Sequence, residues 1–213
     1  RILEKSLSDY IALSKNIDDL KSDKNLKVAI LSSFTLNGLS ETLHVKCADL
    51  GIRYQSYVSD YNQYNQEILN SKSKLYNFSP DVTFLIIDVR NFFGNSFHSA
   101  HNTSDDERRI LAKEKINELE NLIQTFENNT KSKLVITTLN VPSYSPNGII
   151  ETKLQFGFHE MIEEVNTSLR QISKNHVSLY VYDFRQFISK FGENNIFDYR
   201  KFHLGDIQVA FNF

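Results

Sequence analysis

Five short apolar runs, each followed by a segment with helical spacing, constrain the fold of this chain more than any other feature. The runs are rich in β-branched and aromatic residues and are apolar at most positions; they cover residues 28–31, 54–58, 82–87, 134–138 and 177–182. Strands that are buried on both faces have this pattern, which is typical of a parallel sheet covered by helices. We therefore predict a five-stranded parallel sheet.

The segments between the runs predict the helices that connect the strands. Apolar residues recur at three- and four-residue steps in segments 36–50, 61–69, 105–126, 152–173 and 184–191. Five strand-then-helix units imply right-handed crossovers and an α/β fold class, a three-layer α/β/α sandwich. The flavodoxin-like strand order 2-1-3-4-5 is the simplest solution. We expect an extra N-terminal helix in residues 1–22, the α/β domain in residues 23–213, and long loops at 94–104 and 140–150.

The charge balance and the single cysteine exclude several classes of protein. The 213 residues include 24 Lys and Arg against 26 Asp and Glu, whereas nucleic-acid binding normally requires a basic excess. No apolar run is long enough to span a bilayer, so we expect no membrane partner and a cytoplasmic location. A lone cysteine, Cys47, can form neither an internal disulfide nor a thiolate metal cage, and its apolar neighbours predict a buried, inert thiol.

Polar residues follow the end of each predicted strand. In open α/β sheets, ligands bind outside the carboxyl ends of the strands, where these residues would meet. The alternative is that strand ends are polar because loops are exposed. The candidate binding residues are Ser32, Ser33, Thr35, Tyr61, Asn62, Asp88, Arg90, Asn91 and Asn140.

The sequence contains no motif that predicts a cofactor or a metal ion. No glycine-rich phosphate loop follows the first run, and His159, in HEMIEE, lacks the second histidine of a helical zinc site. His98 and His101 are three residues apart, but no carboxylate or third histidine obviously joins them. We interpret them as solvated histidines and expect neither a metal nor a cofactor in this chain.

A serine nucleophile at Ser33 would need a base within hydrogen-bonding reach and a group that orients that base. The best candidates lie in FDYRKFHLGDI, where His203 would be the general base and Asp198 the orienting group. Arg90 and Asn91 would then donate hydrogen bonds to an oxyanion. Alternatively, a serine at this strand end only caps the helix that follows, and the aspartate begins a turn.

Three phrases of the sequence resemble one protein family. They are ILSSFTLNGL, YVSDYNQYNQEILNSKSKLYNFSPDVTFLIID and FDYRKFHLGDIQVAF. They are similar to the N-terminal region of FkbH-like proteins, and the resemblance runs from about Leu26 to the end of the chain. That family implies an SGNH-hydrolase-like α/β domain followed by a haloacid-dehalogenase-type phosphatase domain. Its members are associated with glyceryl transfer from a phosphorylated glycerate precursor to an acyl carrier protein.

The resemblance implies that the partners and the metal lie outside this chain. A phosphatase domain of this type needs a D-x-D-x-T/V motif beside magnesium, and in IIDVRNFF Arg90 stands where the second aspartate would be. The chain therefore resembles the N-terminal domain alone, with Mg²⁺ expected only in the phosphatase domain. The partners that the resemblance implies are the protein's own C-terminal phosphatase domain and an acyl carrier protein.

The SGNH sequence blocks, carried over by this resemblance, fit the chain imperfectly. The block G-D-S-x-T falls on residues 31–35, with Ser33 at the nucleophile position but without the Gly and the Asp. In the block G-x-N-D, Arg90 replaces the asparagine. The block D-x-x-H becomes Asp198 and His203, five residues apart instead of three. These departures favour a domain that binds or positions an acyl or carrier-protein substrate. The alternatives are an active esterase or acyltransferase with a Ser33–His203–Asp198 triad, and a structural or dimerisation module.

Overall fold

A parallel sheet forms the centre of the molecule. The computed structural model describes residues 5–17 and 22–197. In this part of the chain the sheet has five strands: β1 (Asn25–Ser32), β2 (Arg53–Val58), β3 (Val82–Ile86), β4 (Lys133–Thr137) and β5 (Leu179–Tyr182). All neighbouring strands are parallel, and their order is β2-β1-β3-β4-β5. The predicted fold class and strand order are confirmed.

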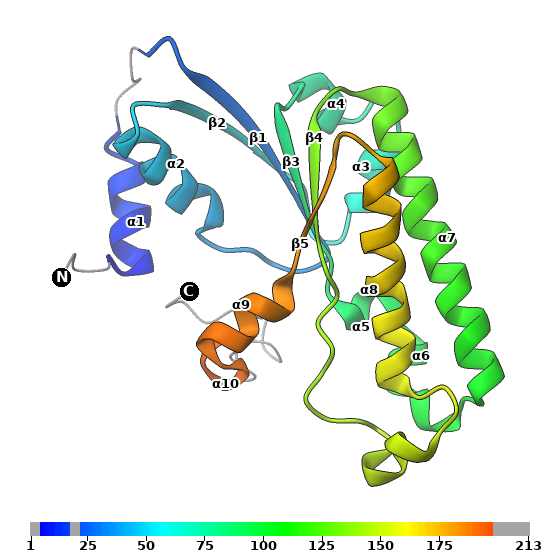
Figure 1. Cartoon of the computed structure of the whole chain (residues 1–213). Helices are drawn as coiled ribbons and strands as arrows, with labels where there is room; N and C mark the ends of the chain where they lie inside the picture. Colours follow the sequence, from blue (N-terminus) through cyan, green and yellow to red (C-terminus); the bar gives the residue numbers. More distant parts are fainter. Residues whose placement is uncertain (1–4, 18–21, 198–213) are drawn as a thin grey trace.

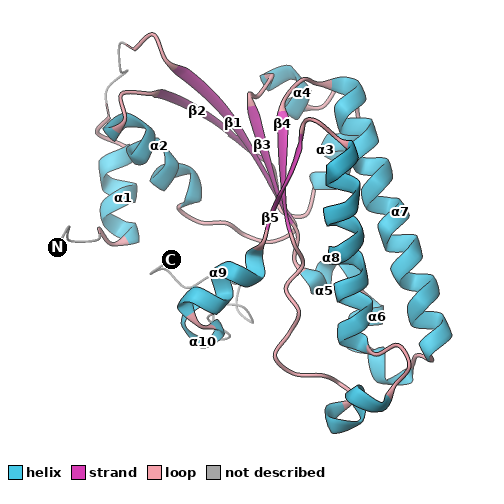
Figure 2. Ribbon diagram, viewed as in Figure 1, coloured by secondary structure: helices cyan, strands magenta, loops and turns pink. Residues whose placement is uncertain are grey.

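Helices cover the two faces of the sheet unequally (Figures 1 and 2). On one face lie α1 (Leu7–Ser14) and α2 (Leu39–Asp49); on the other lie α3 (Tyr64–Leu69), α4 (Lys74–Phe78), α7 (Asp105–Asn129) and α8 (Phe158–Asn175). The short helices α5 (Val89–Phe93), α6 (Asn95–His98) and η1 (Ala100–Asn102) follow β3, η2 (Gly148–Lys153) precedes α8, and α9 (Phe184–Phe191) and α10 (Glu193–Ile196) follow β5. None of the helices in the described ranges could cross a lipid bilayer.

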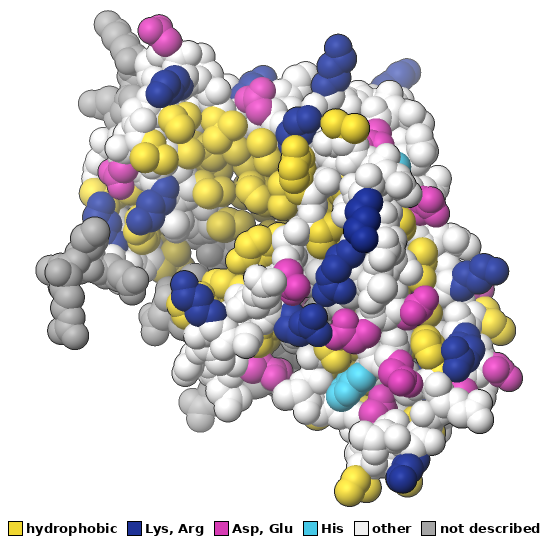
Figure 3. All heavy atoms as spheres, in the orientation of Figure 1, with side chains coloured by type: hydrophobic (Ala, Val, Ile, Leu, Met, Phe, Trp, Pro, Cys, Tyr) yellow, Lys and Arg dark blue, Asp and Glu magenta, His cyan; other side chains and the backbone are white. Residues whose placement is uncertain are grey.

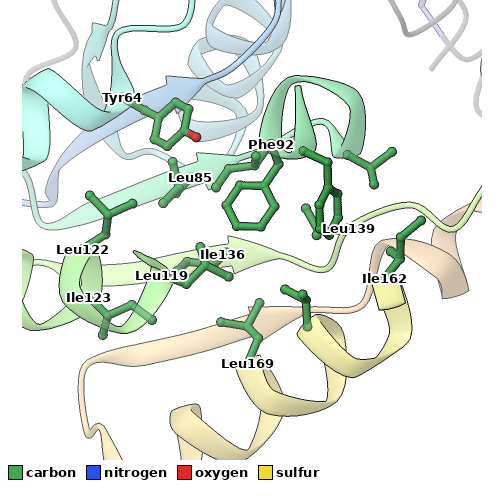
Figure 4. Packing of buried hydrophobic residues seen from close by; sticks show 14 of the residues in the cluster. Tyr64, Leu85, Phe92, Leu119, Leu122, Ile123, Ile136, Leu139, Ile162 and Leu169 are labelled. Atoms are coloured by element: carbon green, nitrogen blue, oxygen red, sulfur yellow. The ribbon is translucent and has the colours of Figure 1, made fainter. Parts of the chain in front are cut away.

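The main hydrophobic core lies between the sheet and the α7–α8 pair (Figure 4). Residues of β3 and β4 that point toward these helices are completely buried, including Leu85 and Ile136. The helices meet them with apolar residues at helical spacing, including Leu119 and Ile123 of α7 and Ile162 of α8. A smaller second cluster lies between β1, β2 and α2.

Helix α2 fixes the position of the N-terminal helix α1. The two helices pack against each other, and Leu7 of α1 fills the space beside Gly38, which precedes α2. A Cβ atom on Gly38 would lie 2.1 Å from Leu7 Cδ1, and the φ angle of +82° there also favours glycine. Cys47, on the inner side of α2, is buried as predicted, and this burial raises the pKa of its thiol.

The structure corrects the sequence prediction in several segments. The predicted loop 94–104 contains helices α6 and η1, which are too short to show a helical period in the sequence. Helix α8 begins at Phe158 rather than at residue 152, because the intervening residues form η2 and an irregular turn. Strand β5 begins at Leu179, and Val177, which was predicted to belong to it, is 89% exposed.

Candidate functional site

Ser33 lies at the carboxyl end of β1, where β1 and β3 meet, and it is completely buried. Its side-chain Oγ accepts a hydrogen bond of 2.7 Å from the backbone N–H of Asp88. Its own N–H donates to the Ile86 carbonyl at 3.1 Å, and its carbonyl accepts from the side-chain amide of Asn91. The N–H, the carbonyl and the Oγ of Ser33 therefore join the end of β1 to β3 and to the segment after β3.

The hydrogen bonds described at Ser33 all join it to β3 and to the segment after β3. An attacking serine must face substrate and a general base, and backbone N–H groups at such a site usually stabilise the oxyanion. The Ser33 side chain has no exposed surface, and its N–H is already bonded to the Ile86 carbonyl. The predicted base His203 and the orienting residue Asp198 lie outside the described residues. The contacts that the structure describes at Ser33 join the end of β1 to β3 and the segment after it, and its role as a nucleophile stays a prediction.

The two predicted oxyanion donors also donate to protein acceptors. Asp88 precedes helix α5, and its carboxylate accepts hydrogen bonds from the Arg90 backbone N–H at 3.1 Å and the Arg90 Nε at 2.8 Å. This contact is a helix N-cap combined with an ion pair. The Asn91 amide binds the Ser33 carbonyl, as described above. Both donors thus hold the start of α5 against the ends of β1 and β3.

Neither serine caps the helix after β1, which was the other sequence interpretation. Helix α2 begins only at Leu39, with Gly38 at the N-cap position and no side-chain cap. The Ser32 Oγ instead accepts a hydrogen bond of 3.1 Å from the Phe34 N–H, which forms a local serine turn. The stretch from Ser33 to Gly38 is therefore an irregular connection at the edge of the sheet.

A small pocket of about 20 Å³ lies at this edge, beside Phe34. This volume is enough for roughly one water molecule. Asp88 and Asn140 are the two predicted binding residues that line it. The other lining residues come from the ends of β3 and β4 and from the segment after β5: Ile86, Ile87, Thr137, Phe184 and Phe197. The sequence interpretation placed Phe34 at this edge but missed the other apolar members, which lie at or beside the ends of strands and helices and look like ordinary core.

The remaining predicted residues lie outside the pocket lining. Tyr61 and Asn62 follow β2 and are exposed, and Asn62 has a positive φ angle of 53° that marks a turn. Thr35 is half-buried in the connection before α2, and Ser32 is buried beside it. The carboxyl edge of the sheet thus brings the residues after β1 and β3 together, while those after β2 form a separate exposed turn.

Two buried polar residues fix the segments that follow β4 and β5: Asn166, which the sequence interpretation did not include, and Thr138, which it placed after the fourth strand. Asn166 of α8 accepts a hydrogen bond from the Leu139 N–H at 2.7 Å and donates one to the Leu139 carbonyl at 3.0 Å. The Thr138 Oγ1 accepts from the Phe184 N–H at 3.0 Å. A signal for Asn166 exists in the sequence, because it is a polar residue at a core position of an amphipathic helix.

The long segment between β4 and α8 is organised by Glu151. Its Oε2 accepts hydrogen bonds from Ser145 Oγ at 2.5 Å and from Asn147 Nδ2 at 2.9 Å, and its Oε1 accepts from the His159 N–H at 2.7 Å. Burial alone would raise the pKa of Glu151, but these hydrogen bonds outweigh it and hold the pKa below the ordinary value of 4.5.

We expect acid to loosen this segment through Glu151. Its pKa is lower in the folded state, so its contribution to stability is present above the unfolded-state pKa and is lost as the pH falls through the folded pKa. Hydrogen exchange of residues 144–159, measured at pH 7 and below pH 4.5, should show less protection in acid. Glu151→Gln should show weak protection at both values, and unchanged protection of the native segment in acid would contradict the assignment.

Comparison with known proteins identifies the family. The sequence profile of the family described as "FkbH, N-terminal domain" matches residues 27–213. The chain belongs to the FkbH N-terminal domain family. The match agrees with the resemblance found in the sequence phrases. No protein with a curated function matches this chain significantly.

Solved structures share the α/β fold of this FkbH N-terminal domain. The N-terminal part of the protein BF1531 from Bacteroides fragilis, described as containing a phosphatase domain complexed with Mg, is similar with a TM-score of 0.82 and 18% identity. The alignment covers 98% of this chain and 53% of that one, so the chain spans about half of the BF1531 structure. The acetyl xylan esterase AlAXEase is similar with a TM-score of 0.51 and 14% identity, over 80% of this chain and 83% of the esterase. At these identities the likeness concerns the fold alone.

Proposed function

We propose that this chain is the N-terminal SGNH-like domain of an FkbH-like phosphatase/glyceryltransferase-type protein. Its role is to bind or position an acyl or carrier-protein substrate, and not to hydrolyse esters. The family match and the fold shared with BF1531 support the domain assignment. The observation that carries the non-hydrolytic role is the bonding of Ser33: its N–H binds the end of β3, and its Oγ and carbonyl bind the segment after β3.

The catalysed reaction would take place in a different part of the protein. The phosphatase domain would be the partner of this domain and would hold the Mg²⁺, as the description of BF1531 suggests by analogy. This chain would need no cofactor, would bind neither nucleic acid nor membrane, and would work in the cytoplasm. The pocket beside Asp88 and Asn140 has room for roughly one water-sized group, so a larger substrate would bind over the edge of the sheet.

An esterase assay with a matched pair of serine variants tests the non-hydrolytic role. We expect no turnover of short acyl esters of p-nitrophenol by the native chain, by Ser33→Ala or by Ser32→Ala. Ser33→Ala should still be less stable, by about 1–3 kcal/mol, because the buried Asp88 N–H loses its acceptor. Turnover by the native chain that Ser33→Ala abolishes and Ser32→Ala retains would instead establish the esterase alternative.

A further inference from the structure

The connection between β1 and α2 contains an asparagine followed by a glycine, Asn37–Gly38. In such a dipeptide the glycine nitrogen can attack the side-chain amide carbon of the asparagine, because glycine has no Cβ that would hinder the approach. The bond between the glycine nitrogen and the asparagine Cγ forms, the Cγ–Nδ2 bond breaks, and ammonia leaves with the proton of the glycine N–H. Water then opens the resulting succinimide at either carbonyl, which gives aspartate or isoaspartate.

The structure leaves the two reacting groups of Asn37–Gly38 free of hydrogen bonds. Asn37 is exposed, and residues 35–38 belong to neither a helix nor a strand. Within the ranges that the structure describes, neither the Asn37 side chain nor the Gly38 N–H has a hydrogen-bonding partner. Leu7, which packs against Gly38, lies in the direction of the absent Cβ and offers no acceptor to the N–H. The attack therefore requires no hydrogen bond to break.

The same dipeptide occurs a second time, at Asn147–Gly148, where both reacting groups are held. The Asn147 Nδ2 donates to Glu151 Oε2 at 2.9 Å, and the Gly148 N–H donates to the Ser145 carbonyl at 3.0 Å. The first of these hydrogen bonds is assisted by the charge of the carboxylate. Because both would have to break before ring closure, the chain contains its own comparison between a free and a held Asn-Gly dipeptide.

An isoaspartate at position 37 would disturb the contact between α1 and α2. The Gly38 carbonyl accepts a hydrogen bond of 2.9 Å from the Thr42 N–H in the first turn of α2, and Leu7 of α1 fills the place of a Gly38 Cβ. Isoaspartate carries the backbone through the former side chain and adds one methylene group directly before Gly38. The glycine can then no longer keep both its place at the start of α2 and its contact with Leu7.

We propose that Asn37 is a site of spontaneous deamidation and that its isoaspartate product loosens α1 from α2. The reaction needs only water, and the change is independent of the role of Ser33. Helix α1 lies beside α2 (Figure 1), and each of its residues is at least partly exposed, so this packing is its main described attachment. Figure 3 shows hydrophobic side chains gathered over α2 and the strands beside it, and loosening of α1 would extend this apolar surface.

The site is tested by incubating the native chain in mildly alkaline buffer, with a parallel sample unfolded in urea. Peptide mapping by mass spectrometry locates each conversion of an amide to an acid, and chromatography separates isoaspartate from aspartate. In the native chain we expect Asn37 to convert at least about tenfold faster than Asn147, because breaking the two hydrogen bonds at Asn147–Gly148 raises the barrier there. In urea the two sites should convert at similar rates.

Hydrogen exchange tests the effect on α1. In the purified isoaspartate form, the backbone amides of α1 should exchange at least about tenfold faster than in the native chain. Asn37→Asp is the matched control, because it introduces the same charge without lengthening the backbone. A negative charge near the start of α2 is favourable to the helix dipole, so this variant should keep the native exchange rates of α1.

The proposed site is wrong if Asn147 converts as fast as Asn37 in the native chain. It is also wrong if Asn37 of the native chain stays intact over a period that converts it in urea. The proposed effect is overturned by native exchange rates of α1 in the isoaspartate form, because Gly38 would then tolerate the longer backbone. Equally fast exchange in Asn37→Asp would overturn it too, since charge and not backbone length would then be the cause.

Discussion

Replacing Arg108 by methionine should destabilise the fold by about 3 kcal/mol or more, since each buried acceptor left without a donor costs about 1–3 kcal/mol. The Arg108 side chain is 3% exposed. Its Nε donates to the Phe156 carbonyl at 2.7 Å, and its Nη1 donates to the carbonyls of Thr103 at 2.5 Å and Ala100 at 3.3 Å. Methionine fills a similar volume but donates nothing.

The effect should be large because the Arg108 side chain holds the segment before α7 against the segment before α8. Ala100 and Thr103 belong to the segment before α7, and Phe156 belongs to the segment before α8. Asp105 completes the connection, because it pairs with Arg108 and accepts hydrogen bonds from the N–H groups of Gln155 and Phe156. Urea unfolding followed by circular dichroism measures the change. Lys113→Met, at an exposed cation of the same helix, is the control and should change stability by less than about 0.5 kcal/mol. Equal stability of Arg108→Met and Lys113→Met would contradict the role of Arg108.

Replacing Asn166 by leucine should cost about 2–5 kcal/mol, the second largest effect that we expect. The side chain is 2% exposed and bonds both the N–H and the carbonyl of Leu139. Leucine leaves both of these buried backbone groups unsatisfied, at about 1–3 kcal/mol each. Asn175→Leu, at the exposed end of the same helix, provides the comparison in the same unfolding assay.

Asn166 also holds the chain segment that leads into the candidate site. Leu139 directly precedes Asn140, which lines the pocket. In Asn166→Leu, the amide protons of Leu139 and Asn140 should exchange with solvent faster than those in the middle of β4, because their segment has lost its anchor on α8. Unchanged exchange at these positions would mean that the end of β4 is held by other contacts.

The sheet could be predicted from the sequence because burial on two sides imposes an unusual pattern. The runs around Val28, Leu85 and Ile136 are apolar at nearly every position, and few other structures tolerate such runs at regular intervals. Boundaries were less predictable, as the exposed Val177 shows. The short helices after β3 were missed because four or five residues do not complete enough turns to show a period.

The edge of the sheet that carries the candidate site was also predictable, but the roles of its residues were not. The sequence neighbours of Ser33 suit both a nucleophile and a helix cap, and the structure excludes only the cap. The Ser33 Oγ accepts from the Asp88 N–H, which is 55 residues away, and no local pattern signals such a contact. The pocket residues Ile86 and Phe184 were missed for a related reason, because apolar residues at strand ends look like ordinary core.

We propose that Ser33 is a structural residue rather than a nucleophile. The most direct test is the intact mass of the chain after incubation with a fluorophosphonate, which reacts covalently with activated serines. The structure predicts an unchanged mass under conditions that fully label an active serine esterase. A single adduct that peptide mapping places on Ser33, and that disappears in Ser33→Ala, would contradict the account.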